Sequence, residues 1–262
     1  MRTKHVAFLA LILLLPWLSA CTESGAMPVT MLGGGVTAAG PAEPDPDVYY
    51  ECEDNAATAT IVATYGSNGA ITNGGGSNLT EDNTSTTSFA GSRSIALNDD
   101  LAFIGGIVTE ASIEDGVFTI QFAYYGNDVS GFGAGYYVRL FAEGSSGVPL
   151  LMWSDNGSDT SFDVYIDEDL YDVTLDDINT ASWHVIRVVV DTGAGSDKLR
   201  VYQGATVGAL ALKYESDAAA VTAPTLATTA FLFGGNGAEN RGVQVVGGLL
   251  DEIKIWYTAE VP

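Results

Sequence analysis

Apolar and polar residues alternate with a period of two in short stretches of the chain from Tyr49 onward. In the clearest stretch, residues 118–124, one face would carry Phe118, Ile120, Phe122 and Tyr124, and the other would carry Thr119 and Gln121. Successive side chains of a strand point to opposite faces of its sheet, so this pattern predicts a strand with one face against a core.

Clusters of glycine, asparagine, aspartate and serine separate these stretches. They lie between the predicted strands 136–142, 149–154 and 161–166, where Asn156-Gly157 supplies the positive φ that a tight hairpin turn needs. Four more strands are predicted at 183–191, 198–203, 230–234 and 242–257. Because no long stretch has a helical period, the pattern predicts an all-β fold, an antiparallel sandwich of two packed sheets.

The first residues have the composition of a signal peptide. Arg2 and Lys4 precede an apolar run at 6–18, which is shorter than the roughly 20 residues that a membrane-spanning helix needs. Leu18-Ser19-Ala20-Cys21 then resembles the bacterial lipobox, which implies cleavage after residue 20 and lipidation of Cys21. Acyl chains on this cysteine would hold the protein on a bilayer. An ordinary secretory signal with a chance cysteine is the alternative.

The same resemblance bears on location and domain organisation. Thr22 stands where an aspartate marks inner-membrane retention in Gram-negative lipoproteins, which implies the outer membrane of the cell envelope in such a source. From 21 to 47 the chain is rich in glycine, alanine and proline, which is typical of a flexible tether. We therefore divide the chain into a signal peptide (1–20), a lipidated tether (21–47) and one sandwich domain (48–262).

The charge of the chain limits its partners. The chain holds 33 Asp and Glu against 10 Lys and Arg, a net charge of −23. Removal of residues 1–20 takes away Arg2 and Lys4 and leaves 8 basic against 33 acidic residues, or −25. Such a surface repels phosphate backbones and anionic lipid head groups. We therefore expect no nucleic-acid partner, and membrane contact through the lipid anchor alone.

Few side chains suit metal or nucleophilic chemistry. Without the signal peptide, His184 is the single histidine, and Cys21 and Cys52 are the two thiols. A zinc site needs about four ligands, most of them nitrogen or sulfur, so zinc is excluded. Catalysis by a serine–histidine pair would have to use His184, which stands in a run of strand formers and is expected to be structural. Cys52 is predicted to be a buried or half-buried strand thiol.

The second half of the chain resembles laminin-G-like domains. The likeness rests on a Trp-His strand, a short strand ending in glycine, a Phe-Gly-Gly segment and a closing Gly-x-x-Asp-Glu-Ile strand, at 181–191, 199–204, 231–235 and 248–256. The first half is a looser match, at Asp54-Asn55 and 89–97. The resemblance implies a jelly-roll sandwich of the concanavalin A-like lectin/glucanase superfamily over nearly the whole domain.

This superfamily includes lectins and glycan-cleaving enzymes, so the fold does not decide the activity. The glucanase motif Glu-x-Asp-x-x-Glu is absent, the acidic run 167–172 has a different spacing, and the arginine-rich strand and Gln-x-His of alginate lyases are absent too. We therefore expect a domain that is not an enzyme and that binds a carbohydrate or an extracellular partner. A divergent polysaccharide hydrolase or lyase, and an envelope module that binds only protein, are the alternatives.

Asp251 stands out in the closing strand. Strict alternation places it on the face of Leu249, Ile253 and Ile255, where an unpaired carboxylate would be costly. The family resemblance implies that this aspartate binds a structural Ca²⁺ together with an early aspartate, and Asp54 is the matching residue. Oxygen ligands alone suit such an acidic chain. The alternative is that Asp251 caps a turn or pairs with an arginine.

A surface for sugars is predicted on the hairpin around 149–166. Alternation puts Asp163, Tyr165 and Asp167 on the face opposite Phe162, and Trp153 ends the preceding strand. Sugar rings stack on exposed aromatic rings while carboxylates accept their hydroxyl groups, so Trp153, Tyr165 and Asp163 form a candidate glycan site. The alternative is that Trp153 belongs to the core and the acids are merely solvated.

Overall fold

A computed structural model describes the residues 43–55, 58, 60–66, 68–73, 84–96, 101–104, 117–126, 137–143, 149–154, 161–166, 169–176, 181–195, 198–216, 231–234 and 248–262. The predicted signal peptide and Cys21 lie outside them. Residues 44–262 belong to one structural unit. In the described part of the chain, no helix is long and apolar enough to cross a membrane.

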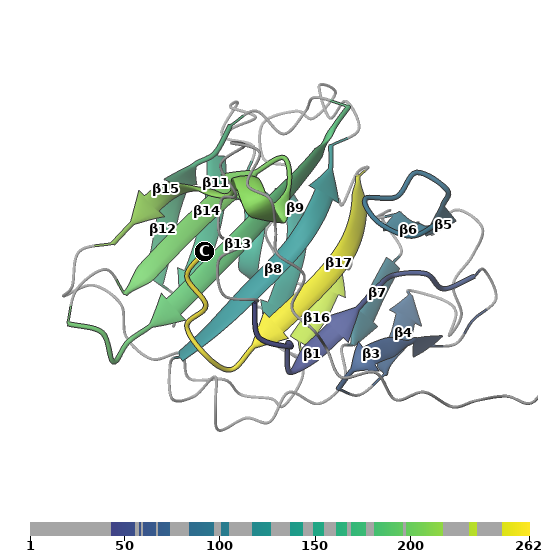
Figure 1. Ribbon diagram of the computed structural model, residues 1–262. Helices are drawn as coiled ribbons and strands as arrows, with labels where there is room; N and C mark the ends of the chain where they lie inside the picture. The colour runs from purple at the N-terminus through teal and green to yellow at the C-terminus, as the bar shows by residue number, and fades with distance from the viewer. Residues whose placement is uncertain are drawn as a thin grey trace, which may run out of the picture. The chain divides into compact units, whose positions relative to one another are not determined.

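Nine strands make up one antiparallel sheet (Figure 1). Seven of them follow the spatial order β15-β14-β13-β8-β17-β1-β3, while β6 pairs with both β17 and β5. The bounds are β1 Val48–Tyr50, β3 Ala63–Tyr65, β5 Thr84–Ser85, β6 Ser94–Ala96, β8 Val117–Tyr125, β13 Trp183–Asp191, β14 Leu199–Gly204, β15 Ala211–Glu215 and β17 Leu249–Trp256. A short 3-10 helix, η2 (Val207–Ala209), lies between β14 and β15.

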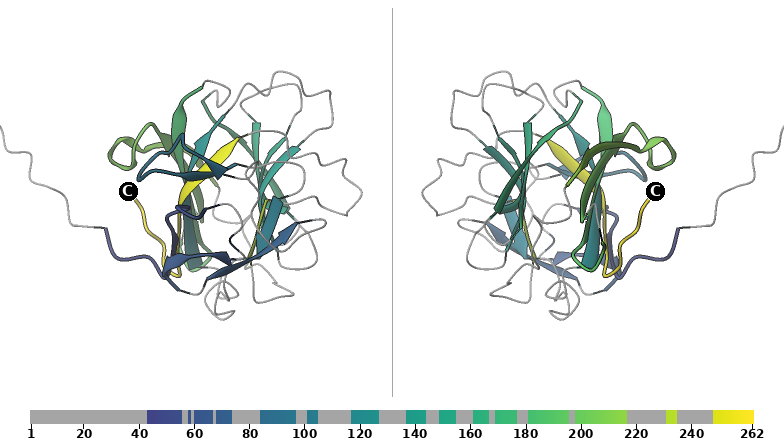
Figure 2. Two further views of the ribbon diagram at one scale, coloured as in Figure 1. Left: turned by 90° about the vertical axis from the view of Figure 1, so that its right-hand side faces the viewer. Right: turned by 90° about the vertical axis from the view of Figure 1, so that its left-hand side faces the viewer.

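Eight strands form the second sheet, in the order β12-β11-β10-β9-β16-β7-β4-β2. The bounds are β2 Thr60–Ile61, β4 Gly69–Asn73, β7 Leu101–Ile104, β9 Tyr137–Glu143, β10 Pro149–Ser154, β11 Ser161–Ile166, β12 Asp169–Thr174 and β16 Phe231–Gly234. The predicted hairpins are present, since β10 pairs antiparallel with β9 and β11. Figure 2 shows the two sheets edge-on as separate layers. The prediction of a sandwich of two antiparallel sheets is confirmed.

Apolar side chains from both sheets fill the space between the layers. β8 contributes the four residues that its alternation predicted, Phe118, Ile120, Phe122 and Tyr124. β13 adds Ile186, Val188 and Val190, and the eight-stranded sheet adds residues that include Val164, Tyr171 and Val173. Each such side chain contributes about 1.5–3 kcal/mol when fully buried. The alternate residues of β8 and β13 lie on the opposite side of the nine-stranded sheet, which we call the outer face.

Part of the outer face is buried as well, which the alternation did not predict. Thr119, Gln121 and Arg187 are at most 2% exposed. The segment after β17 folds back over them (Figure 1), since Thr119 Oγ1 donates to the Thr258 carbonyl at 2.8 Å and accepts from Glu260 N at 2.8 Å. Arg187 donates to Gln121 Oε1 at 2.9 Å and to the Glu260 carbonyl at 3.3 Å. The C-terminal segment therefore occupies this part of the outer face.

Candidate functional site

β17 contains a bulge against β8. Asp251 pairs with Ala123 and Lys254 pairs with Gln121, so three steps along β17 match two steps along β8. Within this interval Glu252 has a φ of 52°, in the left-handed region that residues other than glycine seldom enter. An extra residue of this kind changes the faces of the residues that follow it.

The bulge separates the face of Asp251 from that of Ile253 and Ile255. Leu250, Ile253 and Ile255 all belong to the core, whereas Asp251 lies opposite Ala123 on the outer face. Our prediction that Asp251 shares a face with Ile253 and Ile255 is therefore wrong. It assumed an uninterrupted ladder, in which alternation continues through the strand.

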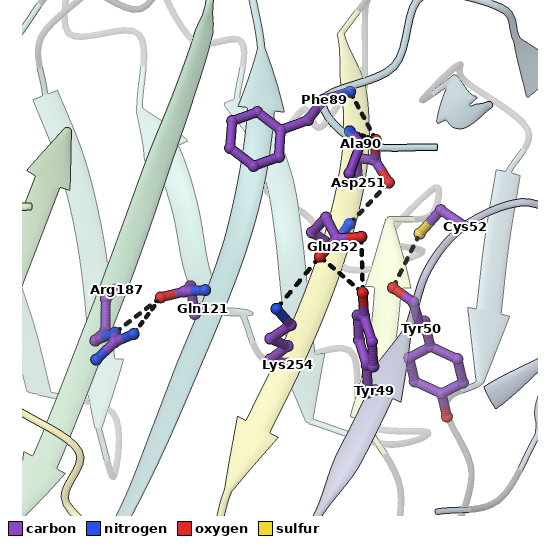
Figure 3. A network of polar contacts seen from close by, with 10 residues as sticks. All are labelled: Tyr49, Tyr50, Cys52, Phe89, Ala90, Gln121, Arg187, Asp251, Glu252 and Lys254. Atoms are coloured by element: carbon purple, nitrogen blue, oxygen red, sulfur yellow. Dashed lines mark hydrogen bonds and ion pairs between the residues drawn. The ribbon is translucent and has the colours of Figure 1, made fainter. Parts of the chain in front are cut away.

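Asp251 is fully buried and accepts three hydrogen bonds from backbone N–H groups (Figure 3). Oδ2 accepts from Phe89 at 2.7 Å and from Ala90 at 3.2 Å, and Oδ1 accepts from Glu252 at 2.9 Å. Burial raises the pKa of Asp251 to about 7, although the three donors favour the charged form. The carboxylate ties residues 86–93, which we call the β5–β6 loop, to β17.

Glu53 holds the same loop at a second point. Its carboxylate accepts from Ser92 N at 2.8 Å, from Arg93 N at 3.1 Å and from Ser92 Oγ at 2.6 Å. Burial opposes the charge, but these donors hold the pKa of Glu53 below its ordinary value. Gly91, between the two anchors, has a φ of 60°, and a Cβ there would overlap the Glu53 carboxylate. The loop is thus fastened by two carboxylates and needs glycine at position 91.

The predicted calcium ligands Asp251 and Asp54 bind separate backbone groups. Asp54 accepts from Val62 N at 3.1 Å, where the chain passes from β2 in one sheet to β3 in the other, and burial raises its pKa. Ca²⁺ takes oxygen ligands, whereas both carboxylates here face N–H donors. Among the described residues, no group of three or more His, Cys, Asp or Glu side chains is placed to hold a metal ion. Calcium binding stays a prediction.

Glu252 anchors a row of side chains that runs to the edge of the sheet. Both of its carboxylate oxygens lie 2.8 Å from Tyr49 Oη, and Oε2 lies 3.2 Å from Lys254 Nζ. The same ammonium lies 4.7 Å from the centre of the Tyr49 ring. Tyr49 stacks in turn on Tyr65 of the edge strand β3, with ring centres 6.3 Å apart. We call Tyr49 and Tyr65 the tyrosine pair. Both partners of the Glu252–Lys254 salt bridge contact Tyr49, on which Tyr65 stacks.

Three partly exposed aromatic rings meet where β8 ends and β13 begins. On the outer face, Trp183 of β13 pairs directly with Tyr125 of β8, with ring centres 5.4 Å apart. Phe89 of the β5–β6 loop meets the Trp183 ring edge-on at 5.9 Å. Sequence reasoning missed this aromatic cluster of Phe89, Tyr125 and Trp183. The two strand-end aromatics were visible in the sequence, but Phe89 reaches them only through the loop that Asp251 anchors.

The predicted glycan residues lie on β10 and β11 of the other sheet. Trp153 pairs with Phe162, which pairs in turn with the buried Val173 of β12. Directly paired residues share a face, so the register puts position 153 on the core side of the sheet. Asp163 and Tyr165 alternate with Phe162 and occupy the opposite side. The side chains of Trp153, Asp163 and Tyr165 lie outside the described residues, and a glycan site on them stays a prediction.

Gln203 fixes the tautomer of His184. Its Oε1 accepts from Asp176 N at 2.6 Å and its Nε2 donates to the Asp176 carbonyl at 3.1 Å, which sets the orientation of the amide. The same Nε2 lies 3.3 Å from His184 Nδ1, so in the neutral ring Nδ1 accepts and Nε2 carries the proton. His184 Nε2 lies 3.2 Å from Ser182 Oγ and therefore donates to it. In this tautomer Nε2 cannot accept the Ser182 proton, as a general base would have to.

Cys52 is a buried free thiol directly after β1. The thiol donates to the Tyr50 carbonyl at 3.7 Å. Burial, and after it the charge of Asp251, raises the pKa of the Cys52 thiol, which keeps it protonated and unreactive. The predicted burial of Cys52 is confirmed and the residue belongs to the core, but it lies just after β1, with a φ of 59°, and not within a strand as predicted.

Comparison with models of protein families and with curated proteins finds no match. Solved structures do match. The receptor-binding domain of botulinum neurotoxin mosaic serotype C/D matches with a TM-score of 0.55 and 11% identity, over 83% of this chain and 48% of that chain. Botulinum neurotoxin type C, whose cell entry depends on interaction with two ganglioside molecules, matches with a TM-score of 0.53 and 12% identity, over 83% and 49%.

A second kind of protein matches as well. Trypanosoma rangeli sialidase, in complex with 2,3-difluorosialic acid, has a TM-score of 0.52 and 12% identity, over 90% of this chain and 34% of that chain. The present chain thus spans about half the length of the neurotoxin chains and about a third of the sialidase. At these identities the likeness shows the β-sandwich fold alone.

Proposed function

We propose that this domain binds carbohydrate on the outer face of the nine-stranded sheet, without catalysis. The aromatic cluster carries the proposal, because its three partly exposed rings offer flat apolar surfaces on which a sugar ring can stack. Trp183 contacts both Tyr125 and Phe89, and Asp251 and Glu53 fasten the loop that carries Phe89. Side chains that are ordered before binding lose little conformational entropy on binding.

Proteins of similar fold support a glycan ligand. Botulinum neurotoxin type C interacts with gangliosides, which carry glycans, and the sialidase is bound to a sialic acid derivative. Because this chain spans half or less of those chains, the proposal uses only the general class of their ligands, carbohydrate.

Binding is favoured over cleavage by the contacts of three described acidic side chains near the aromatic cluster, Asp251, Glu53 and Glu252. A retaining glycosidase needs two carboxylates about 5 Å apart that face the substrate. Asp251 and Glu53 instead accept backbone N–H groups, and Glu252 binds Tyr49 and Lys254. The direction of the hydrogen bond from His184 to Ser182 likewise argues against a nucleophile and base.

We further propose that the domain is laminin-G-like, of the concanavalin A-like superfamily, and is displayed on a lipid anchor at the outer membrane. The order of the segments that carry this resemblance supports the family, and the leader with Leu18-Ser19-Ala20-Cys21 supports the anchor. A tethered carbohydrate-binding domain would hold the cell on glycan-bearing surfaces.

A glycan array probed with the full-length protein tests the proposed function. We expect binding to at least one carbohydrate, and a loss of about tenfold in affinity in Trp183→Ala, as removal of about 1.4 kcal/mol of stacking would cause. Leu212→Ala is the matched control, because Leu212 of β15 is an apolar side chain that is 47% exposed. An array without hits, or equal affinities of Trp183→Ala and the wild type, would contradict the proposal.

A further inference from the structure

We infer that the ligand is a neutral glycan chain, which runs along the outer face from the aromatic cluster to the tyrosine pair. The inference rests on the proposed function. It adds the tyrosine pair as a second contact surface and names the ligand class as a neutral oligosaccharide or polysaccharide. Two separate aromatic surfaces on one face of a sheet fit an extended ligand better than a single sugar.

The distance between the two surfaces exceeds one sugar ring. Trp183 on β13 and Tyr65 on β3 are separated by four strand spacings, or about 19 Å at ~4.8 Å each. Along the strands, the aromatic cluster pairs with Leu249 of β17, and the tyrosine pair lies beside Lys254. Without the bulge residue these two positions are four residues apart, or about 14 Å at ~3.4 Å per residue. A ligand that contacts both surfaces must therefore be a chain of several sugars.

The β5–β6 loop lies along the path between the two surfaces. Asp251, which binds the loop, stands on β17 between Leu249 and Lys254 (Figure 3). The exposed residues that follow Phe89 in the loop have small side chains, Ala90, Gly91 and Ser92. No bulky side chain of this segment obstructs a ligand, and the Ser92 hydroxyl, which donates to Glu53, also has acceptor capacity for a sugar hydroxyl. The loop thus offers a low, polar surface for the middle of the chain.

The tyrosine pair has the properties of a stacking platform. Tyr65 is 41% exposed, and its ring lies against Tyr49. Tyr49 is held by its hydrogen bond to Glu252 and by the Lys254 ammonium over its ring. Both rings are therefore ordered before a ligand binds, which lowers the entropy lost on binding.

The edge strand beside Tyr65 favours a sugar over an added peptide strand. Addition of a strand needs unpaired backbone groups at the edge. Val62 N donates to Asp54 at 3.1 Å, and Ala63 N donates to Asn68 Oδ1 at 2.9 Å. Since these two donors are already used, fewer backbone groups are left for strand addition, and a ligand at this edge also meets the exposed side chains of Val62 and Tyr65.

Charge along the path favours a neutral ligand. Asp251, Glu252 and Glu53 contribute carboxylates, and Lys254 is already paired with Glu252 while Arg93 lies near Glu53. The whole chain has a net charge of −23. Uronic or sialic acid units would be repelled by this field, most strongly at low ionic strength. We therefore expect neutral chains to bind more tightly than acidic chains of equal length.

Titration calorimetry of the full-length protein with neutral oligosaccharides tests the inference. The probes are cello-, laminari-, manno- and xylo-oligosaccharides, from disaccharide to hexasaccharide. For at least one series we expect the affinity to rise about tenfold with length, as a second contact on one ligand predicts. Tyr65→Ala should remove this gain, so that in this variant long probes bind no more tightly than disaccharides, and Tyr65→Phe, which keeps the ring, should retain the gain. Trp183→Ala should weaken binding at every length.

The outcomes separate this inference from the proposed function. Equal affinities for short and long probes, a length gain that survives Tyr65→Ala, or tighter binding of oligogalacturonides would overturn chain binding while carbohydrate binding stands. Absence of any carbohydrate binding would overturn the proposed function itself. Melting of each variant, with Leu212→Ala as the matched control, shows whether a loss of affinity comes from unfolding; because Tyr65 is 41% exposed, its replacement should leave the melting temperature nearly unchanged.

Discussion

The carboxylate of Asp251 accepts the backbone N–H of Phe89 at 2.7 Å across 162 positions of the chain. This bond joins β17, the final strand in the sequence, to the β5–β6 loop. The same loop places the Phe89 ring against Trp183. Asp251 therefore positions one ring of the aromatic cluster without itself belonging to it.

Asp251→Ala should lower the free energy of unfolding by about 1–3 kcal/mol, because three partly buried backbone N–H groups lose their acceptor and water can reach some of them. Urea unfolding followed by tryptophan fluorescence measures this loss. Asp45→Ala, at an exposed position before β1, is the matched control and should change stability little. An unchanged unfolding midpoint in Asp251→Ala would show that this carboxylate does not hold the loop.

Stability should also depend on pH through Asp251. Burial raises the pKa of its carboxyl group from 3.8 to about 7 in the folded protein, so between these values the folded state binds more protons than the unfolded state. The stabilising contribution is complete below 3.8 and is lost as the pH rises through about 7. Relative to Asp251→Asn, the free energy of unfolding of the wild type should therefore fall across this window. A difference between the two proteins that stays constant with pH would contradict the shift.

Gly91→Ala should destabilise the protein by about 1 kcal/mol or more, because position 91 has a left-handed φ and a Cβ there meets the Glu53 carboxylate. Gly195→Ala is the matched control, since a Cβ at position 195 has no heavy atom within 4 Å and no left-handed φ is involved. Thermal melting of the two variants measures the contrast. We expect Gly195→Ala to melt at or slightly above the wild-type temperature, and equal melting of both variants would rule out strain at Gly91.

The two tryptophans Trp153 and Trp183 should respond differently to replacement by alanine. The register puts position 153 on the core side of its sheet, where loss of a buried tryptophan costs about 3–5 kcal/mol. Trp183 is partly exposed, so Trp183→Ala should lose less stability and more glycan affinity. Melting and glycan affinity measured on the same samples distinguish the two sites. If Trp153→Ala keeps its melting temperature and loses affinity, the ligand binds at the β10–β11 hairpin instead.

Cys21→Ala should abolish lipidation, because the lipobox-like sequence ends at this residue. In cells fed labelled palmitate, we expect label on the wild-type protein and none on Cys21→Ala, which should also leave the membrane fraction. Cys52→Ala is the control, since a buried thiol is closed to acylation. Acyl label that persists in Cys21→Ala would contradict the anchor.

Local patterns in the sequence were enough to predict the fold class and part of the core. The alternation at 118–124 predicted the buried face of β8 correctly, because the period of two is a local property of extended backbone. The hairpins of β9, β10 and β11 were predictable for the same reason, since turn residues act on their immediate neighbours.

The position of Asp251 and the composition of the aromatic cluster depend on tertiary contacts. No glycine marks the bulge, so alternation placed Asp251 on the wrong face; Glu252 adopts its left-handed φ where Tyr49 and Lys254 bind its side chain. Phe89 likewise reaches Trp183 through contacts between segments that are far apart in the sequence. Local patterns contain no information on such contacts, because they depend on which surfaces the folded sheets bring together.

The burial of polar residues on the outer face also depends on tertiary contacts. Thr119 and Gln121 are polar and alternate with core residues, so the sequence alone indicates exposure. The folded chain buries both, because the segment after β17 returns across β8 and exchanges hydrogen bonds with Thr119. A polar residue remains exposed only where nothing packs on its face, and that depends on the path of the whole chain.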